Sequence, residues 1–262
     1  MGDEHSYDLV RDAAPKPPRL RGQAIVRPDS DALIDALLAD LFIHAGNCVR
    51  TFGDCHIAID GCPSIEPVLR RLLYDPAYRE FPWARTRVWM VREWNGLSDG
   101  RASAWDLIRE MIVEQSGIPV EQAHPLEAWA SDGAARYTSL LREHLGWRAK
   151  GHDRLDVVLL ALGDDGDLAG LRWPSEGSCD GLCAARTTRA GVVEVGLTAT
   201  CLNAARFIGV YAAGAGVAAP LRHLDENLRR PPGEREAAPG LALSPTGGEL
   251  RWYLDYAACR GA

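Results

Sequence analysis

One short segment in the middle of the chain restricts the possible folds most strongly. Residues 155–162 (LDVVLLAL) are almost entirely apolar and rich in valine and leucine, which is typical of a strand buried on both faces. Gly163 interrupts this run, and three carboxylates follow it, Asp164, Asp165 and Asp167. In an open parallel sheet, the loop after a central strand faces the ligand crevice. The segment therefore predicts an α/β fold in which these acids face a ligand.

Strand and helix patterns alternate along the rest of the chain. A strand pattern at 23–26 precedes apolar residues that recur at helical spacing over 31–51, with Asp29 as a possible helix cap. Further strands are expected at 55–60, 87–91 and 192–198, and further helices at 132–145 and 217–229. Such alternation is typical of a mostly parallel, Rossmann-like sheet with helices on both faces.

The length and composition suit one domain that follows a tail. The chain has 262 residues, of which 47% are hydrophobic, enough for a single α/β domain with a substantial core. Residues 1–22 are polar and contain several prolines, so we expect a partly mobile tail, and residues 23–262 would form the domain.

Charge and apolar patterning limit the partners. A formal net charge of −7 argues against binding to nucleic acid or to an anionic membrane surface. No uninterrupted apolar run approaches the roughly 20 residues of a membrane helix, and the amino terminus lacks the apolar core of a signal peptide, so a cytoplasmic location is expected. The seven cysteines are an odd number and widely spread, which favours reduced thiols. Cys179 and Cys183 have a spacing that a metal could use, but buried or loop thiols are the better interpretation, and no metal is expected.

The acid-bearing segment also carries a family resemblance. It resembles the signature of the 6-phosphogluconolactonases and of the related glucosamine-6-phosphate deaminases, which in lactonases is written Gly-x-Gly-x-Asp-Gly-His-Thr-Ala-Ser-Leu-Phe-Pro. The residues in register are Asp165, Gly166, Ala169, Leu171 and Pro174. Asp167 stands where the family has its histidine. The order of elements is similar over roughly residues 23–260, which implies a 6-phosphogluconolactonase-like fold.

The resemblance implies a catalytic role for Asp167. In the family the histidine acts as general base in a cofactor-free hydrolysis, and a carboxylate can accept a proton in its place when burial or neighbouring acids raise its pKa. Asp165 and Glu93 are the residues expected to assist. The alternative interpretation is that Asp167 is a helix cap or a structural acid at the turn that leads to residues 168–171, because aspartate favours such positions.

The loop that binds sugar phosphate in the family is altered in this chain. Gly61 and Ser64 keep their register in the loop after the strand at 55–60. Asp60 replaces a serine and would repel a dianion, and Pro63 removes one N–H donor. The sequence therefore predicts that phosphate recognition at this loop is altered or lost.

Two further phosphate motifs differ as well. Arg92, Glu93 and Trp94 occupy the positions of an Asp-Glu-Arg triplet, and Ser103 matches the serine that begins the next helix. Arg92 could partly replace the lost arginine, and Trp94 could stack on a sugar ring. Arg189 stands near the position of a phosphate-binding lysine and could be a replacement cation.

We therefore expect a divergent 6-phosphogluconolactonase-like enzyme that acts on a sugar-derived lactone or a related polyol or amino sugar. The expected catalytic residues are Asp167, Asp165 and Glu93. The expected substrate-binding residues are Asp60, Gly61, Ser64, Arg92, Trp94, Ser103, Asp164 and Arg189. No cofactor is expected, and the partner is a small carbohydrate-like molecule. The alternative is a non-catalytic sugar-binding or regulatory protein on the same scaffold.

Overall fold

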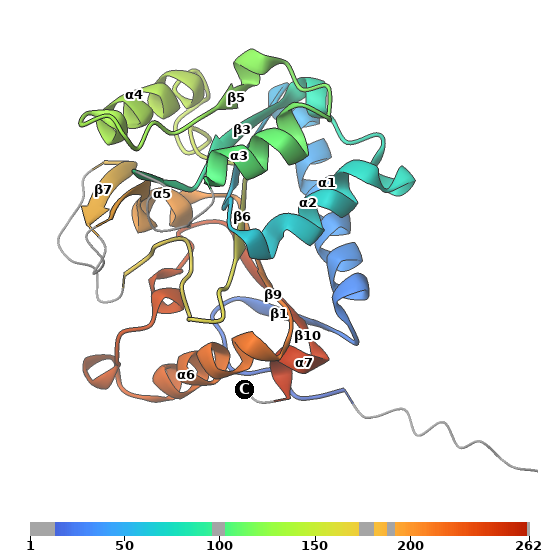
Figure 1. Ribbon diagram of the computed structural model, residues 1–262, viewed down its shortest axis with the longest axis vertical. Coiled ribbons are helices and arrows are strands. Elements are labelled where there is room, and N and C mark those ends of the chain that lie inside the picture. Colours follow the sequence, from blue (N-terminus) through green and yellow to red (C-terminus); the bar gives the residue numbers. More distant parts are fainter. Residues whose placement is uncertain (1–13, 96–102, 173–180, 188–191, 261–262) are drawn as a thin grey trace, which may run out of the picture.

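Seven parallel strands form the central sheet (Figure 1). The structure, a computed structural model, describes residues 14–95, 103–172, 181–187 and 192–260. The strands are β1 (Gln23–Arg27), β2 (Cys55–Ile59), β3 (Thr86–Met90), β5 (Ala123–His124), β6 (Val157–Ala161), β9 (Phe207–Ala212) and β10 (Glu249–Asp255). Their order across the sheet is β1-β10-β9-β6-β2-β3-β5, so the apolar segment that was expected to be a central strand, β6, lies in the middle.

Helices cover both faces of this sheet, which confirms the predicted fold class. They are α1 (Ser30–Phe52), α2 (Glu66–Tyr74), α3 (Ala104–Ile108), α4 (Gly133–Leu145), α5 (Ala199–Ala204), α6 (Ala218–Arg229) and α7 (Tyr256–Cys259), and a π-helical turn (Arg109–Val113) continues α3. Figure 1 shows α1 and α2 to the right of the strands and α4 and α5 to the left. The division into a tail and a single domain stays a prediction.

Helix α1 forms where its cap and apolar stripe predict. The Asp29 carboxylate accepts a hydrogen bond from the N–H of Ala32 at 2.8 Å, and Gly53, with φ of +89°, ends the helix. One 18-residue window of α1 has a mean hydropathy of 1.5, so by length and composition this helix could cross a membrane. Polar residues interrupt its apolar residues, so it contains no uninterrupted apolar run of that length. Its buried stripe packs against β1, β2 and β10, the arrangement of a core helix.

A second sheet was not predicted. Its three strands are antiparallel, in the order β4 (Arg92–Asn95), β8 (Val193–Leu197) and β7 (Cys183–Thr187). Strand β7 lies between the acid-bearing segment and the strand at 192–198, where the sequence analysis places no strand. Val91 joins the two sheets: its N–H donates to Ile59 O at 3.0 Å in β2, and its carbonyl accepts from Leu197 N at 2.8 Å. The chain therefore leaves the main sheet where β4 begins, at Arg92.

Two histidines contact a buried tryptophan in β3. The Trp89 indole N–H donates to His56 Nδ1 at 3.0 Å, and the His124 ring stacks on Trp89 with 4.0 Å between ring centroids. His124 is only 6% exposed. Burial, with the nearby positive charge of Arg87 and the His144 ring, lowers the pKa of His124 to about 3. The folded protein therefore holds this imidazole neutral at pH values where the unfolded chain protonates it.

This histidine makes stability depend on pH. The unfolded chain binds a proton on His124 below about pH 6.5 and the folded chain does not, so the free energy of unfolding should fall as pH drops from about 6.5 towards 3. We expect a loss of about 2 kcal/mol between pH 7 and pH 5 in urea unfolding. His124→Phe should reduce that loss, because phenylalanine keeps the stack on Trp89 without titrating. An equal loss in the variant would show that other groups cause it.

Candidate active site

Several predicted site residues meet at one edge of the main sheet. The chain runs outward from β2 to β3 and β5, then returns to place β6 on the other side of β2. This reversal is a topological switch point, and ligands of open parallel sheets bind beside such points at the carboxyl ends of the strands. Asp60 follows β2, Arg92 follows β3, and Asp167 lies in the loop after β6.

Arg92 lies at the centre of this group. Its Nε donates to Asp60 Oδ1 at 2.9 Å, its Nη1 donates to Asp167 Oδ2 at 2.5 Å, and Nη1 lies 3.7 Å from Glu194 Oε2. Arg92 is only 5% exposed. Burial acts to lower the pKa of Arg92, but the three carboxylates outweigh that effect and raise it. The guanidinium is thus a permanent cation that this chain's own acids surround.

Asp60 lies beneath the site. It is fully buried, and both of its carboxylate oxygens accept hydrogen bonds from Arg92. Burial raises the pKa of Asp60, and the Arg92 charge counteracts that rise. In this geometry Asp60 fixes Arg92 rather than facing solvent, and its predicted contact with substrate stays a prediction.

Asp167 is the acid of this cluster that solvent reaches. Its side chain is 30% exposed, Oδ2 is bound to Arg92, and Oδ1 accepts no hydrogen bond within the described part of the chain. The helix-cap interpretation is wrong, because residues 163–172 contain no helix. Instead, Leu168 pairs with Leu162 in an isolated β-bridge, which turns the chain back along the end of β6. One oxygen of Asp167 is therefore available to a water molecule or a ligand.

The two other acids of this loop have separate contacts. The Asp165 carboxylate accepts the N–H of Asp167 at 2.9 Å, which stabilises the turn at Gly166, where φ is +79°. The Asp164 carboxylate packs over Gly216, where a Cβ atom would lie 2.4 Å from it. Asp164 and Asp165 are both exposed, and their predicted roles towards a ligand stay predictions.

Glu93 holds the start of α3. Its buried carboxylate accepts four hydrogen bonds, from the N–H groups of Trp94 (2.9 Å), Ala104 (3.2 Å) and Trp105 (2.9 Å) and from the Ser103 hydroxyl (2.8 Å). Amide groups at a helix start have no partner within the helix, so this carboxylate satisfies them. The contacts give Glu93 and Ser103 a positioning role, and their predicted roles towards substrate stay predictions.

The loop after β2 packs tightly against the same helix start. A Cβ atom on Gly61 would lie 2.4 Å from the carbonyl oxygen of Ala104, so glycine is needed for this approach. Ser64 is exposed within a short 3-10 helix, η1 (Pro63–Ile65). Glu93 therefore controls, through Ala104, where the Asp60–Gly61 turn lies.

Of the predicted aromatic residue Trp94 and the predicted cation Arg189, the structure describes only Trp94. The Arg92 guanidinium carbon lies 5.1 Å from the centroid of the Trp94 ring, within the range of a cation–π contact. Trp94 thus lies against the same arginine that binds Asp60 and Asp167. Arg189, and Pro174 and Cys179 with it, lie outside the described residues.

Sequence reasoning missed Glu194 and Arg186, which the antiparallel sheet contributes. Glu194 is 3% exposed, and its Oε1, 3.6 Å from Arg186 Nη1, accepts no hydrogen bond from the described residues. Its carboxylate occupies the space beside Gly170, where a Cβ atom would lie 1.9 Å from Oε1. The one signal was a single acid within the apolar strand VVEVGLT. Three carboxylates thus surround Arg92, with Arg186 as a second cation behind them.

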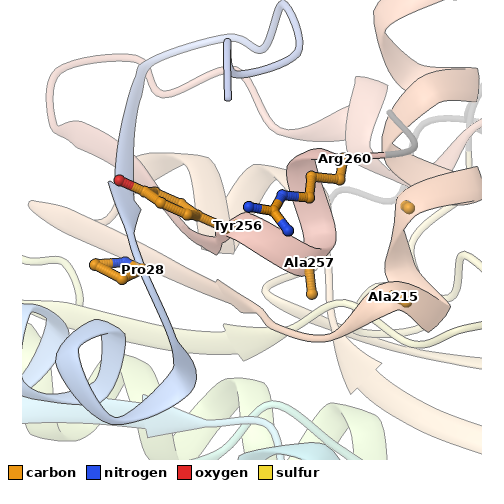
Figure 2. Close-up of a pocket in the computed structure, with 6 residues that line it drawn as sticks. Pro28, Ala215, Tyr256, Ala257 and Arg260 are labelled. Carbon is orange, nitrogen blue, oxygen red and sulfur yellow. The ribbon is translucent and has the colours of Figure 1, made fainter. Parts of the chain in front are cut away.

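A cavity of about 500 Å³ opens at the same edge of the sheet, beyond the predicted residues. Figure 2 shows Tyr256 and Arg260 extending from α7, with Pro28 after β1 and Ala215 before α6. Ala215 belongs to a 3-10 turn, η6 (Ala215–Val217), whose Gly216 contacts Asp164. The cavity therefore lies beside the turn against which the acid loop packs.

The described residues contain one group with metal-ligating atoms close together, at the opposite edge. Cys48, Cys55 and Asp156 are buried with these atoms within 4.8 Å of one another. Asp156 already accepts hydrogen bonds from Arg148 at 2.9 Å and from Arg206 at 3.0 Å. Because protein donors occupy this carboxylate and burial raises the pKa of the Cys55 thiol, the group does not resemble a metal centre.

Comparison with known proteins finds a matching family model, related sequences and similar solved structures. The family model for glucosamine-6-phosphate isomerases/6-phosphogluconolactonase matches residues 28–252. The GDH/6PGL endoplasmic bifunctional protein of Homo sapiens is 26% identical over 254 residues, which are 93% of this chain and 31% of that protein, so the chain spans about a third of it. A 6-phosphogluconolactonase of Synechocystis is 26% identical over 90% of this chain and 96% of its own. The crystal structure of the 6-phosphogluconolactonase from Thermotoga maritima superposes with a TM-score of 0.72 at 18% identity, over 89% of this chain and 99% of that one.

Proposed function

Because the chain belongs to the glucosamine-6-phosphate isomerase/6-phosphogluconolactonase family, we propose that it is a divergent lactonase-type hydrolase. Its substrate is a sugar-derived lactone, or a related polyol or amino sugar, and its phosphate recognition is altered or lost. A cytoplasmic location stays a prediction from the sequence.

The contacts and the burial of Arg92 are the main support for this proposal. Its guanidinium already donates to Asp60 and Asp167 and is almost fully buried. A substrate phosphate could bind it only by displacing one of these carboxylates, which would leave a charge without its partner in a poorly solvated place. A dianion would also be repelled by the remaining acids of the cluster. This arrangement favours substrates that carry no phosphate at this position.

Asp167 supplies the base in this proposal. Its Oδ1 accepts a proton from a water molecule while the water oxygen attacks the lactone carbonyl carbon. The ring C–O bond of the resulting tetrahedral intermediate then breaks, and the leaving oxygen takes the proton back from Asp167. Arg92 holds Oδ2, and so fixes the carboxylate during both steps. The reaction consumes only water, so the proposal includes no cofactor.

A second candidate is a non-catalytic sugar-binding protein. The observation that favours it is that aspartate replaces the family's histidine and that Arg92 already occupies one Asp167 oxygen. In that case the acid cluster would bind a neutral or amine-bearing sugar without turnover.

Initial rates with a panel of freshly prepared lactones test the proposal. Proton release is followed with gluconolactone, an amino-sugar lactone and 6-phosphogluconolactone, with spontaneous hydrolysis subtracted. We expect turnover of at least one unphosphorylated lactone, and a lower kcat/KM for the phosphorylated one. Faster turnover of 6-phosphogluconolactone would contradict altered phosphate recognition. Binding of sugars without turnover of any lactone would support the second candidate.

A further inference from the structure

A second cavity lies at the edge of the sheet opposite the acid cluster. Its volume is about 240 Å³, and its lining includes Phe52, Asp54, Arg85, Arg87 and Trp147. These residues come from the end of α1, the starts of β2 and β3, and the segment after α4. This volume limits the cavity to a small ligand.

The carboxylates around this cavity are already neutralised. Asp54 accepts hydrogen bonds from Arg148 Nη2 at 2.6 Å and from His56 Nε2 at 3.1 Å. These contacts outweigh the effect of burial and lower the pKa of Asp54 to about 2, so Asp54 stays ionised. Asp156 behind it accepts from Arg148 and from Arg206. The negative charges of Asp54 and Asp156 are therefore balanced by Arg148 and Arg206, and Arg85 and Arg87 add further positive charge.

Arg85 and Arg87 add positive charge to this cavity, and the one ion pair of Arg87 with a described residue is a long one. Arg85 forms no ion pair within the described part of the chain, and the nearest carboxylate oxygen to Arg87 is Asp54 Oδ2, at 3.8 Å from Nε. A guanidinium group binds a carboxylate through two parallel N–H groups. The cavity therefore presents two cations to one anionic group.

Trp147 gives the cavity a flat wall. The side chain is 60% exposed, unusual for so large an apolar group, and the guanidinium carbon of Arg148 lies 5.7 Å from its ring centroid. An exposed indole beside arginines is the composition of binding hot spots. We propose that this cavity binds a small planar organic anion, an aromatic or heteroaromatic carboxylate, with its charge on Arg85 and Arg87 and its ring on Trp147.

This site is separate from the proposed hydrolysis. It lies at the amino ends of β2 and β3, whereas Asp60 and Arg92 follow the carboxyl ends of the same strands. A ligand in the cavity would not occupy the space near Asp167. The inference therefore stands or fails independently of the catalytic proposal.

Titration calorimetry with benzoate on the full chain tests the inference. We expect saturable binding with a Kd of about 1 mM or tighter. Two comparison ligands should each bind with a Kd at least about tenfold higher than that of benzoate. Benzamide has the same shape without the charge, and inorganic phosphate has charge without a ring. Arg85→Gln and Arg87→Gln should weaken benzoate binding by a similar factor. The matched control is Arg70→Gln, because Arg70 is 60% exposed on α2 and its one ion pair among the described residues is with Glu66, and it should leave the Kd unchanged.

Tryptophan fluorescence gives a second readout. Benzoate should change the emission of the native chain, and the change should largely disappear in Trp147→Phe. Absence of saturable benzoate binding would overturn the inference, as would equal binding of benzamide or an unchanged Kd in Arg85→Gln. Since Arg85 is exposed and its substitution should not disturb folding, the test remains decisive even if Arg87→Gln folds poorly.

Discussion

Replacing Asp167 by asparagine is expected to lower the rate of lactone hydrolysis by roughly 10²–10⁴-fold, the usual contribution of a positioned general base. The amide keeps the size of the side chain, and its oxygen can still accept the Arg92 N–H, so the fold should persist. It cannot take a proton from water at neutral pH. Initial rates on the best unphosphorylated lactone, with circular dichroism to confirm folding, measure the effect.

A histidine at the same position separates loss of the base from general damage. Asp167→His should recover part of the activity, with a rate that rises through about pH 6.5 as the imidazole loses its proton. Glu66→Gln, which removes an exposed carboxylate on α2, is the control and should keep the native rate. If the asparagine variant retains most of the activity, Asp167 is not the base.

Replacing Arg92 by methionine is expected to destabilise the protein by about 3–5 kcal/mol, because removing one partner leaves a buried charge uncompensated. Asp60 would then be fully buried near two other carboxylates, with no guanidinium group bound to it among the described residues. For a chain of this size the change corresponds to a fall in Tm of roughly 10 °C. Thermal and urea unfolding would both report it.

A second substitution should restore part of the stability that Arg92→Met loses. Asp60→Asn removes the buried charge, so the double variant with Arg92→Met should regain at least half of the lost stability. Arg70→Met breaks an exposed ion pair on α2 and should change stability by about 0.5 kcal/mol or less. A cost at Arg92 no larger than that at Arg70 would mean that the ion-pair cluster does not form in solution.

Strands β1, β2, β3 and β6 of the main sheet could be predicted from the sequence, because they are short apolar runs separated by helical patterns. The second sheet could not. Strand β4 consists of Arg92, Glu93, Trp94 and Asn95, which shows no apolar alternation, and β7 is a mixed segment in a region that reads as a loop. Contacts at Val91, between residues far apart in sequence, decide both. Local patterns carry little information of that kind.

The sequence predicts where in the fold the site lies, but not which of its side chains bind one another. The rule that parallel strands present their carboxyl ends at one edge correctly brings Asp60, Arg92 and Asp167 together. Nothing local indicates that Asp60 faces Arg92 across two strands, or that the Glu93 side chain turns towards α3. Glu194 is the single acid of the expected strand at 192–198, but its approach to Arg92 could not be predicted, since the antiparallel sheet was not expected.

The contact between Gly170 and Glu194 couples the side chains that these two positions can accept. Gly170 has φ of +64°, and any side chain there would collide with the Glu194 carboxylate. A side chain at 170 therefore requires the Glu194 carboxylate to move from its place beside Arg92. In an alignment of relatives, the two positions should vary together. A glutamate introduced alone into a relative with a side chain at 170 should be poorly tolerated, although the same residue is accommodated here.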